Sequence, residues 1–308
     1  MSNLENLRKN QNLADLLKAA ESASQTNKFA KKEYPADYPV DLWSCKADAA
    51  GNGSAVIRFL PAPAGENVPW AKLHRFSFKS ELTGKWYIAN SPTTLGRDHK
   101  DPMVEFNNAL YATKETEKIE LAKKQKMKKM YFANILVVND PADPSKNGQV
   151  FLFRFGQKIF DKILLAMKPN NEGIDPDDWV LPIDPFSPDT GANFNLRMVR
   201  VNGQASFDTS SFGKSKPLAS NDADIEAILN KCKSIAAITA PDKFQSYEEL
   251  ERKLNWAMGI SNGATQSTAS VEKPKPVYQG EDSSDEPDPV SDDDTDSNVD
   301  YYRSLANS

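Results

Sequence analysis

Two apolar strand patterns joined by a turn occupy residues 131–155, directly after a cluster of lysines at residues 123–129. The first pattern, residues 131–138, is almost wholly apolar, and the second, residues 149–155, has phenylalanine at alternate positions. The residues between them are rich in asparagine, aspartate and proline and end in glycine, which is typical of a turn. Further strand patterns cover residues 54–60, 73–78, 85–89 and 194–201. Several short strands separated by turns favour an antiparallel barrel or sandwich over alternating strands and helices.

The lysines and rings of this segment suit a groove that holds single-stranded nucleic acid. Such a groove needs cations for the phosphates and exposed rings on which bases can stack. The residue types alone favour a second interpretation, in which the lysines lie on a solvated helix face and the phenylalanines in a core. Phe151, Phe153 and Phe155 share one strand face, and the sequence leaves open whether that face is exposed.

Helical patterns lie between and after the strands. Helices are expected at residues 113–130, 156–167 and 225–235, and a fourth ends before Gly259. Ser246 and Glu249 have the spacing of a capping box that opens the fourth helix. Residues 169–191 contain five prolines and are expected to form a long ordered loop. The sequence therefore predicts a mainly β chain with α-helices, of the α+β class.

Charge is distributed unevenly, and the overall net charge of −5 hides this. Residues 272–308 contain eleven acidic and three basic residues, a net charge of −8, so the remainder carries −5 + 8 = +3. After Gly259 the composition becomes polar and then aspartate-rich, and such a segment cannot bury enough apolar surface to fold alone. We therefore divide the chain into an N-terminal arm at residues 1–27, a core at residues 28–258 and a disordered acidic tail at residues 259–308.

Both ends of the chain carry short patterns that suit contacts with other molecules. The arm has two basic residues before a short amphipathic helix with leucines on one face: Arg8, Lys9, Leu13, Leu16 and Leu17. The tail has an aspartate run and an aromatic end, formed by Asp292, Asp293, Asp294, Asp296, Tyr301, Tyr302 and Leu305. The composition of the tail fits a peptide that docks onto partners and, equally, an inert solubilising segment.

The sequence contains few residues that are arranged as a catalytic or metal-binding site would require. His74 and His99 are the only histidines, which disfavours histidine triads and multi-histidine metal sites. Asp98, His99 and Asp101 could bind a divalent ion, as in a nuclease, but the same residues suit an exposed turn. The tail carboxylates lie on chain predicted to be disordered, where catalytic geometry cannot be held. We therefore do not expect an enzyme.

Cysteine use and hydropathy indicate an intracellular protein. Cys45 and Cys232 are too few for a disulfide framework and lack the spacing of a metal site, which fits a reducing compartment. No apolar run approaches the roughly 18 residues of a membrane span, and the polar N-terminus is not typical of a secretion signal. We expect a soluble protein with no membrane partner.

Several blocks of this sequence resemble the helix-destabilising single-stranded DNA-binding proteins of T-even-type bacteriophages. The most informative blocks are residues 131–138, YFANILVV, and residues 153–163, FRFGQKIFDKI. Other matching blocks follow in family order at residues 51–61, 84–88, 191–194 and 242–250. Their joint occurrence across about residues 41–258 is much more specific than any single block.

The resemblance implies a protein of three parts that binds DNA. It implies an OB-fold-containing core with an added subdomain, an arm for cooperative contacts between neighbouring copies, and an acidic tail for phage replication and recombination proteins. In the family, aromatic and basic groups line the DNA groove, and the matching positions are Arg58, Tyr111, Lys128, Lys129, Tyr131, Phe132, Phe153, Arg154 and Phe207. The implied function is to coat and protect single strands, without strong sequence choice, during DNA replication, recombination and repair. The implied location is the cytoplasm of the infected bacterial host.

The sequence departs from the family in two places. The structural zinc site of the family uses one histidine and three cysteines, but the matching positions are Phe76, Ser91, Asp101 and Val104, with His74 nearby. We therefore expect no zinc or other cofactor, and a subdomain held by ordinary packing. The basic cluster of the arm is diluted at residues 8–12, so cooperativity is either weaker or carried more by the leucine face.

Two other functions would use overlapping features. An RNA-binding translational regulator, acting on the protein's own messenger RNA, would use the same groove and could be a secondary role. A metal-dependent nuclease, a less favoured alternative, would show turnover of a labelled strand with magnesium or manganese.

Overall fold

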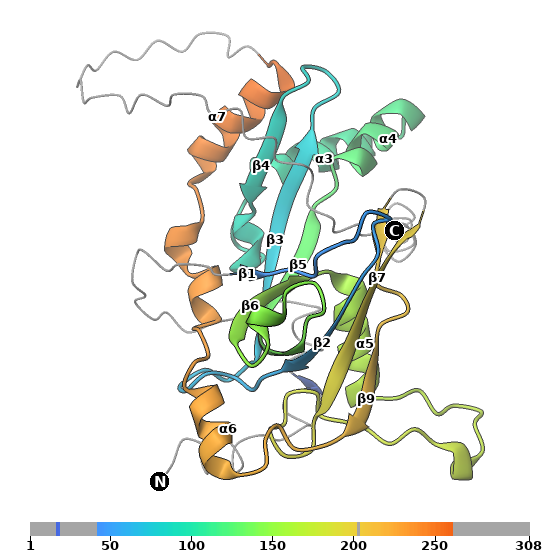
Figure 1. Cartoon of the computed structure of the whole chain (residues 1–308). Coiled ribbons are helices and arrows are strands. Elements are labelled where there is room, and N and C mark those ends of the chain that lie inside the picture. The colour runs from blue at the N-terminus through green and yellow to red at the C-terminus, as the bar shows by residue number, and fades with distance from the viewer. Residues whose placement is uncertain (1–16, 19–41, 202–203, 261–308) are drawn as a thin grey trace.

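The computed structural model describes residues 17–18, 42–201 and 204–260, and its fold is mixed α+β and dominated by a sheet (Figure 1). The predicted fold class is confirmed. The strands are β1 (Leu42–Trp43), β2 (Gly53–Phe59), β3 (Trp70–Lys79), β4 (Trp86–Asn90), β5 (Lys128–Asn139), β6 (Val150–Phe155), β7 (Ala192–Val201), β8 (Gln204–Ser206) and β9 (Ser211–Ser215). The helices are α3 (Pro102–Ala112), α4 (Thr116–Lys124), α5 (Gln157–Met167), α6 (Asp222–Leu229) and α7 (Tyr247–Met258). Short 3-10 turns are η1 (Pro92–Thr94), η2 (Pro144–Lys146), η3 (Pro176–Asp178), η4 (Ala236–Thr239) and η5 (Pro241–Lys243).

β5 is the central strand of the sheet. β6 pairs antiparallel with it along one edge, while β3 and then β2 pair antiparallel with successive parts of its other edge. β2 continues the sheet to β7, which pairs with β8 and β9, and β3 continues it to β4. β1 pairs parallel with β6. The mostly antiparallel pairing agrees with the short strands of the sequence, and the OB-fold implied by the resemblance stays a prediction.

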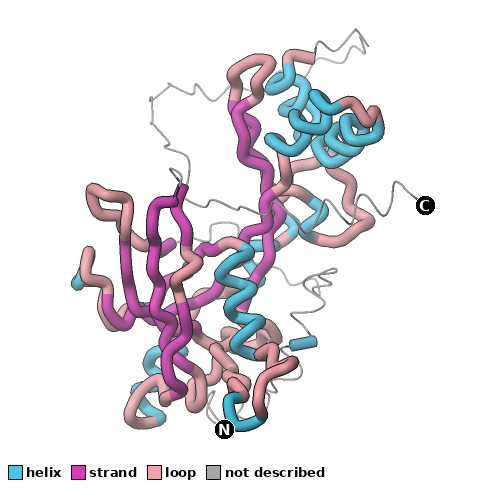
Figure 2. The backbone as a smooth tube through the Cα atoms, turned by 90° about the vertical axis from the view of Figure 1, so that its right-hand side faces the viewer, coloured by secondary structure: helices cyan, strands magenta, loops and turns pink. Residues whose placement is uncertain are grey.

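A large hydrophobic cluster, here called the main cluster, lies between the sheet and α5. It takes inward side chains from β2, β5, β6 and β7 and from one face of α5. On that face, Ile159, Phe160 and Ile163 have the spacing of an amphipathic helix. Figure 2 shows α5 alongside the strands that it covers. Because each large side chain contributes about 1.5 to 3 kcal/mol when fully buried, this cluster is a principal source of stability.

A second hydrophobic cluster, here called the hairpin cluster, lies at the far end of β3. It joins Phe76 and Tyr87 of the β3–β4 hairpin to Leu250 and Leu254 of α7. Met103 of α3 is fully buried in the same cluster. The hairpin therefore forms a subdomain with its own core, and β3 belongs to both cores.

α7 begins and ends where the sequence predicts. The Ser246 hydroxyl accepts a hydrogen bond from the Glu249 N–H at 3.2 Å, and the Glu249 carboxylate accepts one from the Ser246 N–H at 3.0 Å. The helix ends at Met258, and Gly259 follows with a φ of 69°, a left-handed conformation that glycine adopts without steric cost. The predicted capping box is confirmed.

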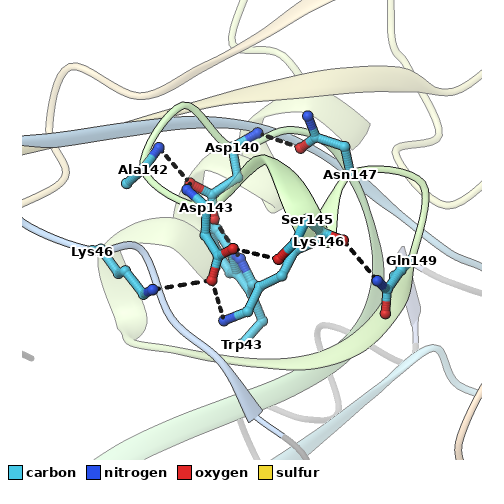
Figure 3. Close-up of polar contacts among 9 residues, drawn as sticks. All are labelled: Trp43, Lys46, Asp140, Ala142, Asp143, Ser145, Lys146, Asn147 and Gln149. Atoms are coloured by element: carbon cyan, nitrogen blue, oxygen red, sulfur yellow. Dashed lines mark hydrogen bonds and ion pairs between the residues drawn. The ribbon is translucent and has the colours of Figure 1, made fainter.

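Asp140 closes the turn between β5 and β6 (Figure 3). Its carboxylate accepts hydrogen bonds from the Trp43 indole N–H at 3.0 Å and from the Asp143 backbone N–H at 3.1 Å. Its own backbone N–H donates to the Asn147 side-chain oxygen at 2.7 Å. Lys46 forms an ion pair with Asp143 at 3.0 Å. These contacts confirm the predicted turn and fasten it to β1 and to the segment that follows β1.

The helix predicted at residues 113–130 is wrong in extent. α4 ends at Lys124, and β5 begins at Lys128. Met130 pairs with Leu73 and is buried, so pairing in the sheet overrides the helical tendency of a lysine-rich segment. α3 was not predicted, and the helix expected at residues 225–235 is shorter because α6 ends at Leu229.

The arm and the tail lie almost wholly outside the described residues. Outside them are the predicted contact residues of the arm and tail: Arg8, Lys9, Leu13, Leu16, Asp292, Asp293, Asp294, Asp296, Tyr301, Tyr302 and Leu305. Leu17 is described; it is half-buried and packs against the main cluster of its own chain. Within the described ranges, no helix is both long and apolar enough to cross a bilayer.

Candidate nucleic-acid interface

β3 and β5 lie side by side from the main cluster to the hairpin cluster, and the stretch between the two clusters is basic. His74 pairs with Lys129, and Lys72 lies two residues before His74, so the three side chains share one face of the strand pair. On the same face of β3, Trp70 belongs to the main cluster and Phe76 to the hairpin cluster. We call Lys72, His74 and Lys129 the basic strip.

The two lysines of the basic strip repel each other in a partly buried setting. Lys72 is 7% exposed, and burial together with the charge of Lys129 lowers its pKa to about 8. Burial and the two lysine charges lower the pKa of His74 to about 3, so its imidazole is neutral at pH 7. Charges interact more strongly there than in water because the dielectric constant is lower. A bound anion such as a phosphate would relieve the repulsion, which makes an anion the ligand that the strip favours.

Neighbouring hydroxyl groups fix the position of His74. Its ring Nδ1 forms a hydrogen bond with the Thr93 hydroxyl at 3.0 Å. Its backbone N–H donates to the Thr94 hydroxyl at 2.9 Å, and its carbonyl accepts from the Ser91 N–H at 2.8 Å. The η1 turn therefore supports β3 behind the basic strip and holds the strip in place.

Lys128 and Lys129, which were predicted to line one groove, lie on opposite faces of β5. Lys129 belongs to the basic strip, whereas Lys128 pairs with Arg75 on the other face. Successive side chains of a strand alternate between its faces, so two adjacent lysines cannot both point into one groove from a regular strand. Both lysines are half-buried.

Three of the predicted stacking rings are core residues. Tyr131 and Phe153 are 2% and 4% exposed and belong to the main cluster. Phe132 is 6% exposed and is packed with Ile238 and Phe244 on the other face of the sheet. Stacking on a base needs an accessible ring face. This placement corrects the expectation that these three rings contact bases directly.

The strand face shared by three phenylalanines of β6 is the inner one. Phe151, Phe153 and Phe155 are 8%, 4% and 2% exposed, and all three belong to the main cluster. The rings of Phe153 and Phe155 stack with centroids 5.5 Å apart. The interpretation of alternating phenylalanine as core, which the residue types alone favoured, applies to this strand.

Arg58 is a structural residue. It is 1% exposed, and its Nη2 donates to the carbonyl oxygens of Ser187 at 2.9 Å and Lys216 at 3.0 Å. Burial lowers its pKa to about 10, which leaves it charged at neutral pH. A Cβ at Gly191 would lie 2.6 Å from Nη2, so only glycine allows this close approach. The prediction of Arg58 as a DNA contact is therefore corrected: it anchors the loop before β7.

Three other predicted contacts keep part of their side chains accessible. Tyr111 is half-buried near the end of α3, and Arg154 is half-buried on β6. Phe207 follows β8 and packs only in part against the main cluster. Their roles stay predictions.

Lys72 and His74 were not predicted as contacts. The strand expected at residues 73–78 began one residue too late to include Lys72, although β3 begins at Trp70. The available signal was the alternation of Trp70, Lys72 and His74 with apolar residues, which places two polar side chains beside a buried tryptophan.

Comparisons with known proteins identify the family. Residues 51–258 match the family described as gp32 DNA binding protein like. The chain belongs to this gp32-like family. The single-stranded DNA-binding proteins of Enterobacteria phages T2 and T4 are each 37% identical to it, over 238 and 233 residues. These matches cover 76% and 74% of this chain and 75% and 74% of the two relatives. A single-stranded DNA-binding protein of Escherichia phage SV14 is 45% identical over 73 residues, 23% of this chain and 63% of that protein.

The positions that match the family zinc site in this gp32-like chain do not fit a zinc ion. The Asp101 carboxylate accepts a hydrogen bond from the Met103 N–H at 2.8 Å and so caps α3. Ser91 hydrogen-bonds to the same carboxylate, while Phe76 and Val104 pack in the hairpin cluster. In the part of the chain that is described, no three His, Cys, Asp or Glu residues are grouped to hold a metal. A zinc-free subdomain stays our prediction.

A separate pocket of about 730 Å³ lies over β2, β7 and the β5–β6 turn of the gp32-like core. Its lining includes Lys46, Asn139, Asn195 and Arg197, and no residue of the basic strip. Lys46 is already paired with Asp143, so its charge is partly neutralised. The basic strip, in contrast, gathers two lysines on one face of two paired strands, and we take it as the candidate nucleic-acid interface.

Proposed function

We propose that this chain binds single-stranded DNA along the basic strip and coats it without strong sequence choice during phage DNA replication, recombination and repair. The observation that carries the proposal is the pair of lysines, Lys72 and Lys129, held between two hydrophobic cores with their charges unfavourably close. Membership of the gp32-like family and the likeness to phage single-stranded DNA-binding proteins support the same ligand.

Phosphates supply the sequence-independent part of the affinity. A phosphodiester beside Lys72 and Lys129 replaces lysine–lysine repulsion with attraction and releases counterions from the DNA. Each phosphate neutralised on a single strand changes the slope of log affinity against log salt by about −0.7. Four or five such contacts correspond to a fall of about three log units per tenfold increase in salt.

Stacking supplies a part of the affinity that salt does not screen. Each base stacked on an aromatic ring contributes about 1 to 3 kcal/mol. Of the rings predicted from sequence, Tyr111 and Phe207 keep part of their surfaces accessible, so we assign stacking to them. Tyr131, Phe132 and Phe153 instead hold the strands that carry the strip.

The role is stoichiometric rather than catalytic. Protein bound along a single strand removes that strand from the equilibrium with duplex, so duplex DNA is destabilised. In the proposal, copies bind cooperatively through the arm, and the acidic tail contacts phage replication and recombination proteins. The tail, as a polyanion, also competes with DNA for the basic strip, and the protein's own messenger RNA is a secondary ligand.

Tryptophan fluorescence during titration with a single-stranded homopolymer, repeated across a salt series, tests the function. We expect saturable quenching whose affinity falls with salt. A Lys72→Gln, Lys129→Gln protein should bind more weakly and with a shallower salt dependence than the wild type. Absence of saturable binding by the wild type at low salt would overturn the proposal.

A further inference from the structure

The loop between α5 and β7, residues 169–191, carries an exposed apolar surface on an acidic segment. It contains six acidic residues and no lysine or arginine. Ile174, Trp179, Val180 and Leu181 are 42%, 52%, 58% and 77% exposed. Figure 1 shows the loop, coloured yellow-green, projecting away from the sheet. We call these four residues the loop patch.

Hydrogen bonds hold the loop patch in one shape. The Asn171 side chain donates to the Val180 carbonyl and accepts from the Val180 N–H, both at 3.1 Å. The Trp179 indole N–H donates to the Ile174 carbonyl at 3.0 Å. An ordered loop that presents contiguous apolar side chains to water indicates a binding surface, because burial of those side chains would be favourable.

A basic and aromatic surface lies on the β3–β4 hairpin and the end of α7. Trp86, Ile88 and Trp256 are 43%, 37% and 55% exposed. The Lys85 ammonium lies 4.5 Å from the centre of the Trp256 ring, and Lys253 donates to the Ile88 carbonyl. We call Lys85, Trp86, Ile88, Lys253 and Trp256 the hairpin patch.

The two patches lie at opposite ends of the molecule and are complementary. In Figure 1 the β3–β4 hairpin is at the top and the acidic loop is at the bottom. The loop patch has an exposed tryptophan on a loop rich in carboxylates, and the hairpin patch combines lysines with two exposed tryptophans. Complementary patches at opposite ends of one chain allow a head-to-tail contact, which repeats as an open filament when the rotation between copies does not close a ring.

We propose that the loop patch of one copy docks on the hairpin patch of the next copy along a single strand. This contact rests on the proposed coating of DNA and is additional to any contact made by the arm. It is an open, repeating contact, and so it suits a linear DNA lattice better than a closed dimer. Its expected effect is to strengthen binding where several copies are adjacent and to leave the binding of one copy unchanged.

Affinities for two lengths of single-stranded DNA separate this contact from DNA binding itself. One DNA is an oligonucleotide trimmed until titration gives one protein per strand, and the other is long poly(dT). The variants are Trp179→Ser and Leu181→Ser in the full chain. The matched control is Leu165→Ser, which changes a leucine that is 56% exposed on α5. We expect each loop variant to lose roughly tenfold in affinity on poly(dT), with no change on the oligonucleotide and none for the control.

Charge reversal identifies the docking partner of the loop. Asp177→Lys with Asp178→Lys, and separately Lys85→Glu with Lys253→Glu, should each weaken binding to poly(dT). All four substitutions in one chain should restore it, because every contact between neighbours then has opposite charges again. Circular dichroism of each variant excludes unfolding as the cause.

The other possible results would overturn either the docking proposal or the proposed function. Variants of either patch that weaken oligonucleotide and poly(dT) binding equally would mean that the patch contacts DNA, and the docking proposal would fall. Folded loop variants that match the wild type on both DNAs would also overturn it. Failure of the wild type to bind the oligonucleotide would instead overturn the proposed function.

Discussion

The ring of Tyr131 stacks on the ring of Phe160, with centroids 4.0 Å apart and an angle of 10° between the ring planes. The Tyr131 hydroxyl donates to the side-chain oxygen of Gln157 at 2.8 Å. Both partners lie on α5, so Tyr131 joins the central strand to the helix that covers it. Aromatic pairs contribute about 0.5 to 1.5 kcal/mol beyond burial of their area. Tyr131 therefore stabilises the fold instead of offering a ring to a base.

Substitution of Tyr131 should change stability and leave DNA binding intact. We expect Tyr131→Ala to lower the free energy of unfolding by about 3 to 5 kcal/mol and Tyr131→Phe by about 1 kcal/mol. Urea denaturation measures both values. In buffer without urea, and at a temperature where each variant is folded, the affinity of the variant for a single-stranded oligonucleotide should match that of the wild type. A Tyr131→Ala protein of normal stability that binds DNA ten times more weakly would support stacking instead.

Lys72 should contribute one phosphate contact. Lys72→Met removes the charge and keeps most of the volume of the side chain, so the affinity for single-stranded DNA should fall. The slope of log affinity against log salt should become shallower by about 0.7. The control is Lys118→Met, which removes an exposed lysine paired with Glu115 on α4 and should leave the slope unchanged. Equal slopes for Lys72→Met and the wild type would place Lys72 outside the interface.

The same substitution should stabilise the protein at neutral pH. The pKa of Lys72 is about 8 in the folded protein against an ordinary 10.5, so folding disfavours its charged form. That cost is fully present below pH 8 and is relieved as pH rises toward 10.5. We expect Lys72→Met to be more stable than the wild type by on the order of 2 kcal/mol at pH 7, with the difference shrinking at higher pH. Thermal unfolding across this pH range measures the difference.

Binding of DNA near pH 8 should take up protons. In the free protein Lys72 is about half protonated at this pH, and a nearby phosphate favours the charged form and raises its pKa. Calorimetric titrations in two buffers with different ionisation enthalpies give the number of protons bound. We expect a net uptake in the wild type that is reduced in Lys72→Met. Identical proton uptake by both proteins would mean that titratable groups other than Lys72 bind the protons.

The parts of this fold that could be predicted from the sequence are those set by interactions between residues close together in the chain. The capping box at Ser246 and the left-handed Gly259 depend on residues next to them in the chain, and both ends of α7 were therefore found. The turn closed by Asp140 is similarly local. The helix expected at residues 156–167 follows the phenylalanine-rich strand directly in sequence, and it matches α5.

The parts that were missed depend on contacts between distant segments. Lys128 and Met130 follow a lysine-rich segment whose sequence is typical of a helix. They nevertheless belong to β5, because both residues pair with residues of β3. The face on which Phe132 lies became buried only because the chain near Phe244 covers it. The basic strip combines Lys72 with Lys129, which are far apart in sequence, and no pattern within either segment reveals their proximity.

Chelation of metal should leave the hairpin subdomain intact. The hairpin cluster packs Phe76 and Tyr87 against α7, and Asp101 caps α3 instead of facing a set of ligands. We expect the same melting temperature with and without EDTA, and no stoichiometric zinc by elemental analysis of protein purified without chelator. One zinc per chain, with a lower melting temperature after its removal, would contradict the prediction and require a rearranged site.

Removal of the acidic tail should tighten DNA binding at low salt. The tail carries −8 against +3 for the rest of the chain, so it competes with phosphates for the basic strip. A chain that ends at Ile260 should bind a single-stranded oligonucleotide more tightly than the full chain at 20 mM salt, where the Debye length is on the order of 20 Å. The two proteins should converge as salt increases, because screening weakens the competition. A full-length control with Asn at Asp292, Asp293, Asp294 and Asp296 keeps the length of the tail and should give part of the same gain. If the full and shortened chains have equal affinity at low salt, the tail does not compete with DNA. Its proposed role would then be limited to contacts with other proteins.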